Sequence, residues 1–168
     1  MRVKLLDHRE QEVEAEIVEG SKVRLPTFQD GWRFNFNKHS KVPETLTYAL
    51  VTKNTPNIVE GCLIYRMLNK NEPYMAYLEV APHNKGTEKM YDRVAGSLIA
   101  YACRLSFIQG QGIYKGWLLF DVQEEDKRDE EKLMKVYSSK YKAKRIDKTT
   151  TMCISPKDGE ALINEYLN

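Results

Sequence analysis

Apolar residues change their spacing several times along the chain, and each change marks a different element. Two segments rich in strand-forming residues, 46–52 and 58–68, are separated by the turn sequence Asn54-Thr55-Pro56-Asn57 and predict a hairpin. A third strand over residues 74–81 is expected to end at Pro82, because proline has no N–H to donate to a ladder. The middle of the chain therefore begins with three consecutive strands.

The spacing becomes helical over residues 94–107, which are rich in alanine and leucine and predict a buried helix. Gly110 and Gly112 interrupt this pattern. Residues 114–122 contain the continuous apolar run Trp-Leu-Leu-Phe and predict a fully buried strand. Residues 126–141 have acids in their first turns and lysines in their last turns, which suits the helix dipole and predicts a second helix.

Two short alternating segments, 143–146 and 150–154, predict a closing pair of strands. Residues 158–167 then predict a last short helix. From residue 46 onward the expected order is β-β-β-α-β-α-β-β-α.

The region before residue 46 has the least regular pattern. It opens with a charged segment that has helix-like or strand-like character. Aromatic residues at alternate positions follow and predict one face of a strand; they are Trp32, Phe34 and Phe36. Core packing is the first interpretation of these aromatic residues, and a wall of a substrate site is the second.

The length and composition indicate one globular domain. The chain has 168 residues, of which 42% are hydrophobic and 30% charged, enough to form its own core. We expect a single domain over 1–168, with a divergent part at 1–45, a central core at 46–155 and a C-terminal helix at 156–168. The apolar runs are far shorter than the roughly 20 residues that cross a bilayer, and the opening residues lack the apolar core of a signal peptide. We therefore expect a cytoplasmic protein with no membrane partner.

Charge gives little support to nucleic-acid binding. The chain has 26 Lys and Arg against 24 Asp and Glu, a net charge of +2, well below that of a dedicated nucleic-acid binder. A basic run near residue 145 is expected to form a solvated edge, with an acidic partner or nucleic acid as the less favoured alternative. Its members are Lys140, Lys142, Lys144, Arg145 and Lys148.

The cysteines and histidines show no ligand spacing. Three widely separated cysteines predict reduced core thiols instead of a disulfide framework; they are Cys62, Cys103 and Cys153. The histidines share no knuckle or helical spacing, and they are His8, His39 and His83. No metal site is predicted.

The order of the elements and four local motifs resemble the GNAT superfamily of N-acetyltransferases. The motifs are Val80-Ala81-Pro82, Val94-Ala95-Gly96-Ser97-Leu98-Ile99, Trp117 to Val122, and Tyr137-Ser138-Ser139-Lys140-Tyr141. The resemblance covers residues 46–154. It implies an α/β (α+β) protein with a GNAT-like fold: a mixed, mostly antiparallel central sheet of about six to seven strands, with splayed central strands and flanking helices.

The resemblance implies acetyl-CoA as the acyl donor, with its pyrophosphate at a helix N-terminus. The family loop Arg/Gln-x-x-Gly-x-Gly/Ala fits this chain in two registers. If Lys85-Gly86 begins the motif, Glu88 and Met90 stand where glycines are expected. In the preferred register Arg93-Val94-Ala95 take the Gly-x-Gly/Ala positions after a longer loop, and Arg93 replaces the first glycine.

The implied CoA-binding set therefore combines a strand, loop cations and a helix start. The strand Leu78-Glu79-Val80 would pair with the pantetheine arm through its main chain. Phosphate contacts would come from Lys85, Lys89 and Arg93, and the helix start would supply Val94, Ala95, Gly96 and Ser97. In the alternative interpretation the three cations solvate an exposed loop, and Gly96 begins the helix without binding a ligand.

The resemblance also implies the catalytic groups. Tyr137 matches the family tyrosine that protonates the departing thiolate, and because that transfer is uphill by roughly 2 kcal/mol between unperturbed groups, the hydroxyl is expected to act by hydrogen bonding. Asp121, at the end of the buried strand, is the first choice for the base, and Glu79, with a pKa raised by desolvation, is the second. The alternatives are a core-filling role for Tyr137 and structural roles for both carboxylates.

We therefore predict an N-acetyltransferase that moves an acetyl group from acetyl-CoA to a primary amine by direct attack, without a cysteine nucleophile. The alternative is a noncatalytic acyl-CoA-binding or protein-interaction domain on the same fold, which Arg93 favours and Tyr137 opposes. The acceptor stays open among a small polyamine, an antibiotic, a peptide N-terminus, a protein lysine and an aminoacyl-tRNA. An exposed strand edge is compatible with a homodimer.

Overall fold

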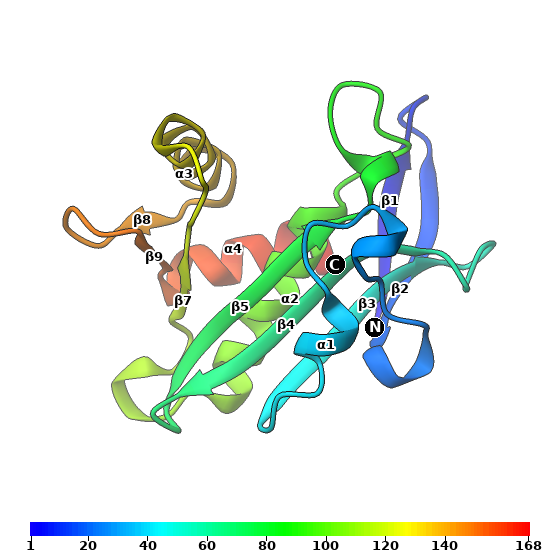
Figure 1. Ribbon diagram of the computed structural model, residues 1–168. Coiled ribbons are helices and arrows are strands. Elements are labelled where there is room, and N and C mark those ends of the chain that lie inside the picture. The colour runs from blue at the N-terminus through cyan, green and yellow to red at the C-terminus, as the bar shows by residue number, and fades with distance from the viewer.

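The computed structural model describes all 168 residues and contains one nine-stranded sheet flanked by helices (Figure 1). The strand order is β6-β1-β2-β3-β4-β5-β7-β9-β8. The strands are β1 (Arg2–Asp7), β2 (Glu12–Glu19), β3 (Thr45–Thr52), β4 (Val59–Leu68), β5 (Glu72–Val80), β6 (Tyr91–Asp92), β7 (Leu118–Asp121), β8 (Lys144–Arg145) and β9 (Thr151–Ile154). The helices are α1 (Phe36–His39), α2 (Val94–Gln109), α3 (Lys127–Tyr141) and α4 (Pro156–Leu167).

The succession expected from residue 46 is confirmed, but the sheet has more strands than the six to seven predicted. The antiparallel hairpin β1–β2 forms the region whose secondary structure the sequence left open. Its outer edge pairs with β6, a two-residue strand inside the long loop before α2. The other edge of the sheet is β8, which also has only two residues.

The strand predicted through the N-terminal aromatic residues is wrong. The segment is a turn that leads into α1, and the Asn35 side chain caps this helix by accepting a hydrogen bond from the Lys38 N–H at 3.0 Å. Trp32 and Phe36 are buried, and Phe36 contacts both Trp32 and Phe34 edge to face. The core-packing interpretation is thus confirmed for Trp32 and Phe36. The turn brings their rings together on the sheet more closely than a strand would.

The strand predicted over residues 114–122 is shorter and less buried than expected. The chain forms a 3₁₀ turn at Gly112–Tyr114 and passes through Gly116, at φ +86°, before β7 begins at Leu118. Trp117 is 37% exposed. The continuous apolar run is therefore divided between a turn that covers the end of α2 and a four-residue strand, and this is why it lacks the alternation of a half-buried strand.

The two faces of the sheet carry different layers (Figure 1). Helices α2 and α4 cover one face, where Leu98 and Ile99 belong to a cluster of 26 buried residues. The opposite face carries α1 and the N-terminal segment, in a smaller cluster that includes Cys62 and Ile64 of β4. No helix combines the length and the apolar composition needed to cross a bilayer.

The centre of the sheet splays between β5 and β7. These parallel strands are paired at one position, Tyr74 with Leu119, and then diverge. A bulge in β5 lies next to this point, because Ile64 pairs with Tyr77 and Tyr65 with Met75, which leaves Ala76 without a partner. The expected splayed central strands are thereby confirmed.

Candidate active site

A cavity of about 410 Å³ lies where β5 and β7 diverge. Its walls come from the N-terminal segment, β5, β7 with the residues that follow it, and α3. Ten of its fifteen lining residues are hydrophobic, and the other five are polar or charged: Arg33, Arg66, Asp121, Gln123 and Glu124. Four hollows elsewhere, of about 670, 750, 600 and 450 Å³, are larger, but each is lined mainly by polar and charged residues.

Tyr137 enters this cavity from α3. Its ring packs against Phe120 of β7, with the ring centroids 4.8 Å apart. Burial, and to a lesser extent the negative charge of Glu124, raises the pKa of Tyr137 to about 12. The hydroxyl therefore keeps its proton at neutral pH, as a hydrogen-bond donor to a developing thiolate must.

Asp121 lies in the same cavity, at the end of β7. One of its carboxylate oxygens accepts a hydrogen bond from the Tyr74 hydroxyl at 2.7 Å, and the other accepts one from the Thr151 hydroxyl at 2.6 Å. Burial, followed by the bond to Asp121, raises the pKa of Tyr74 to about 12. The structure thus brings the first-choice base and Tyr137 into one cavity and leaves lone pairs on Asp121 for a further donor.

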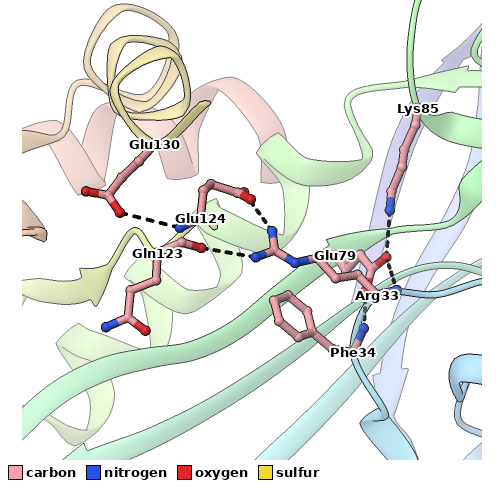
Figure 2. Close-up of polar contacts among 7 residues, drawn as sticks. All are labelled: Arg33, Phe34, Glu79, Lys85, Gln123, Glu124 and Glu130. Carbon is pink, nitrogen blue, oxygen red and sulfur yellow. Dashed lines mark hydrogen bonds and ion pairs between the residues drawn. The ribbon is translucent and has the colours of Figure 1, made fainter. Parts of the chain in front are cut away.

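Glu79 is placed differently, on the face of the sheet that carries α1 (Figure 2). Its side chain is 5% exposed, and its carboxylate accepts hydrogen bonds from the backbone N–H groups of Arg33 and Phe34, each at 2.9 Å. The ammonium group of Lys85 is 2.6 Å away. Glu79 does not line the cavity, so the geometry favours its structural alternative, an anchor for two loops.

We expect Glu79→Gln to destabilise the protein by about 3 kcal/mol, because the amide nitrogen would face backbone donors and Lys85 would lose its counter-ion. Chemical denaturation followed by circular dichroism measures this change. The matched control is Glu14→Gln, which removes an exposed ion pair with Lys53 and is expected to leave the stability nearly unchanged. Equal stability of the two variants, together with an altered pH–rate profile for Glu79→Gln, would instead assign Glu79 to the base.

The long loop between β5 and α2 is fixed by a second buried carboxylate, Glu60. Its Oε2 lies 2.5 Å from Nε2 of His83 and accepts a hydrogen bond from the Asn84 amide at 2.7 Å. The side-chain amide oxygen of Asn84, Oδ1, in turn accepts a hydrogen bond from the Tyr91 N–H at 3.0 Å. The loop therefore has a defined path despite its length.

Helix α2 begins at Val94, directly after Arg93, which has φ +76°. This left-handed conformation favours glycine, the residue that the preferred register expects at this position. The Arg93 guanidinium turns toward α4: it donates to the Glu165 carbonyl at 2.5 Å and lies 4.7 Å from the centre of the Tyr166 ring. The first N–H groups of α2 have no partner within the helix, as at any helix start.

The other expected phosphate contacts also have protein partners. Lys85 pairs with Glu79, and Lys89 pairs with Asp92 at 3.0 Å. Gly96 packs against α4, because a Cβ atom there would lie 2.2 Å from the Tyr166 ring. Ser97 is fully buried, and its hydroxyl has no hydrogen-bond partner. Phosphate binding by these residues stays a prediction.

Arg33 and Glu124 are also among the polar residues that line the cavity, and sequence reasoning missed both. The Arg33 guanidinium donates to the Glu124 carboxylate at 2.6 Å and to the Gln123 carbonyl at 3.1 Å (Figure 2). An acidic residue shortly after a buried strand is a local signal that could have indicated Glu124. No local signal indicates Arg33, because its partner is 91 residues away.

A splayed mixed sheet, with a helix at the end of the long loop and a tyrosine-bearing helix beside the gap, defines the GNAT fold, and the predicted resemblance is confirmed at this level. Among solved structures, the chain is similar to a tyrosine-to-phenylalanine variant of the AtaT toxin bound to the C-terminus of the antitoxin AtaR, with a TM-score of 0.59 and 14% identity over 88% of this chain and 97% of that one. It is similar to AtaTR bound with AcCoA, at 0.55 and 14% over 89% and 98%. It is also similar to the KacTA–DNA complex, at 0.58 and 12% over 90% and 99%. No protein-family model and no curated protein matches the chain.

Proposed function

We propose that this protein is an N-acetyltransferase that transfers an acetyl group from acetyl-CoA to a primary amine. The observation that carries the proposal is the half-buried Tyr137, whose hydroxyl has a raised pKa, in the cavity between the diverging strands β5 and β7. Asp121, in the same cavity, supplies a carboxylate. The GNAT fold of the chain agrees with acyl transfer.

The residues present fit an extended acyl-CoA in two respects. Beyond Tyr74, β5 has no β7 partner, so its main chain is available to pair with an added extended segment such as the pantetheine arm. The N-terminus of α2 offers N–H groups to an anion. Arg93 in place of glycine fits less well, since its side chain lies against α4 unless it turns toward the phosphates.

In the proposed reaction a neutral amine nitrogen attacks the thioester carbonyl carbon, so that a C–N bond forms and the C–S bond breaks. Asp121 takes the amine proton, directly or through a water molecule, and the Tyr137 hydroxyl donates a hydrogen bond to the sulfur. With a pKa of about 12 for Tyr137 against about 8.5 for a thiol, full proton transfer to the sulfur costs about 5 kcal/mol. Tyr137 therefore acts by hydrogen bonding as charge develops on the sulfur.

Calorimetric titration of the purified protein with acetyl-CoA tests the first requirement of the proposal, with Arg93→Ala as the companion variant. Micromolar binding, followed by release of free thiol in the presence of one member of an amine library, is the expected result. Weaker binding by Arg93→Ala would support a phosphate contact, whereas equal binding would leave Arg93 a contact of α4. A folded protein that does not bind acetyl-CoA would contradict the proposal.

The alternative function is a noncatalytic acyl-CoA-binding domain. It is favoured by the partners already held by Lys85, Lys89 and Arg93. Binding of acetyl-CoA, without release of free CoA thiol in the presence of any amine, would select this alternative. Tyr137 distinguishes the two, because a noncatalytic domain has no need of a hydroxyl beside the thioester.

A further inference from the structure

Arg33 spans the open end of the cleft between β5 and β7 (Figure 2). Its backbone N–H is held by Glu79 of β5 at 2.9 Å. Its guanidinium reaches the segment after β7, where it contacts the Glu124 carboxylate at 2.6 Å and the Gln123 carbonyl at 3.1 Å. One residue therefore ties the β5 side of the cleft to the β7 side.

The backbone of Arg33 is fixed to β5. Glu79 is buried and also accepts a hydrogen bond from the Phe34 N–H, so two consecutive backbone groups are fixed to β5. The guanidinium lies 5.0 Å from the centre of the Phe34 ring. A planar fork with several donors suits two acceptors at once, and lysine at this position could not reproduce that geometry.

Two polar side-chain links cross the cleft. The first is the bond from Tyr74 to Asp121, at the closed end where β5 and β7 still pair. The second is Arg33, at the open end. Since no strand pairing joins β5 to β7 beyond Tyr74, Arg33 is the polar contact that sets the separation there.

The segment that Arg33 holds leads directly into α3. The Glu124 N–H donates to the Glu130 carboxylate of α3 at 3.4 Å, and the Asp126 side chain caps the helix through the Arg128 N–H at 2.8 Å. Tyr137 lies further along the same helix. A shift of residues 123–124 would therefore move the start of the helix that carries the hydroxyl.

We propose that Arg33 is a positioning residue, which fixes the width of the open end of the cleft and thereby the place of Tyr137 relative to β5. This inference rests on the proposed acetyltransferase function. A misplacement of about 1 Å between reacting groups can cost about 100-fold in rate. Arg33 is thus expected to affect turnover more than acetyl-CoA binding.

The test uses Arg33→Ala, Arg33→Lys, Arg33→Glu and a double variant that reverses the charges of the pair. In this reversed pair Arg33→Glu is combined with Glu124→Arg. We expect Arg33→Ala to lower kcat by about 10- to 100-fold, while the Kd for acetyl-CoA changes less than about threefold. Arg33→Lys should recover part of the loss, and the reversed pair should have a higher kcat than Arg33→Glu alone. The matched control is Arg24→Ala, which removes an ion pair with Asp30 in the same N-terminal segment, outside the cavity.

Hydrogen exchange of the peptide covering residues 122–130 gives a readout that does not require activity. Faster exchange there in Arg33→Ala, with slow exchange restored in the reversed pair, is the expected result. Unchanged exchange in Arg33→Ala would overturn the positioning role, and a larger change in the Kd for acetyl-CoA than in kcat would show that Arg33 binds the ligand directly. If the wild type transfers no acetyl group, the proposed function fails, and the exchange data still decide whether Arg33 holds the segment.

Discussion

Replacing Tyr137 with phenylalanine is expected to lower kcat by about 100-fold and to leave the Kd for acetyl-CoA nearly unchanged. The phenylalanine ring keeps the packing on Phe120, so only the hydroxyl is lost. That hydroxyl would serve the transition state, where charge grows on the sulfur, more than the bound substrate, and losing one hydrogen-bond donor to developing charge typically costs about 100-fold or more. Steady-state assays of thiol release, combined with calorimetry, measure both quantities.

Tyr141→Phe is the matched control, because it makes the same change on the same helix outside the cavity. We expect its kcat to stay within about twofold of the wild type. Since burial raises the pKa of Tyr137 to about 12, the tyrosine should cause no loss of activity as the pH rises from 7 to 10. An unchanged kcat in Tyr137→Phe would remove the hydroxyl from the mechanism.

Gly96→Ala is expected to destabilise the protein by about 3 kcal/mol. The added methyl carbon would lie 2.2 Å from Cε1 of Tyr166, so α2 and α4 would have to move apart or the ring would have to leave its site. Neither movement is small, because Tyr166 is buried and Arg93 lies over its ring. The midpoint of chemical denaturation measures the loss.

The companion variants are Tyr166→Ala and the double variant. If the overlap causes the loss, Gly96→Ala should cost much less in the Tyr166→Ala background than in the wild type. Equal costs in the two backgrounds would contradict this packing explanation. Gly96→Ala with wild-type stability but weakened acetyl-CoA binding would return Gly96 to the binding site.

Local sequence patterns correctly predicted where an element ends when a nearby proline or glycine stops it. Pro82 follows β5 and Gly110 follows α2, as predicted, since each residue acts on its own backbone. The predictions failed where apolar spacing had two explanations. Trp117 and its neighbours have the composition of a buried strand, but the chain turns at Gly116, and Trp117 lies outside the strand and is partly exposed.

The parts of the candidate site that depend on the order of helices and strands along the chain were predictable. Tyr137 lies on a helix and Asp121 ends a strand, both of which the sequence predicts, and the structure brings the two residues into one cavity. The tertiary partners of Glu79 could not be foreseen: two are backbone N–H groups of a segment more than forty residues earlier, for which side-chain identity carries no signal. The same holds for Arg33, whose partner Glu124 lies 91 residues away along the chain.

Strands β1 to β5 are neighbours in the sheet in the same order in which they are synthesised. By residue 80 a growing chain holds a complete five-stranded meander, whose pairings are all between consecutive strands and therefore form early. The face that α2 and α4 will cover, with Leu5, Leu50 and Leu63, is still bare at that point, and α4 is the last element made. Until α2 and then α4 are made, this apolar surface is unprotected on the ribosome, so the yield of the protein in cells should depend on chaperones that bind nascent chains.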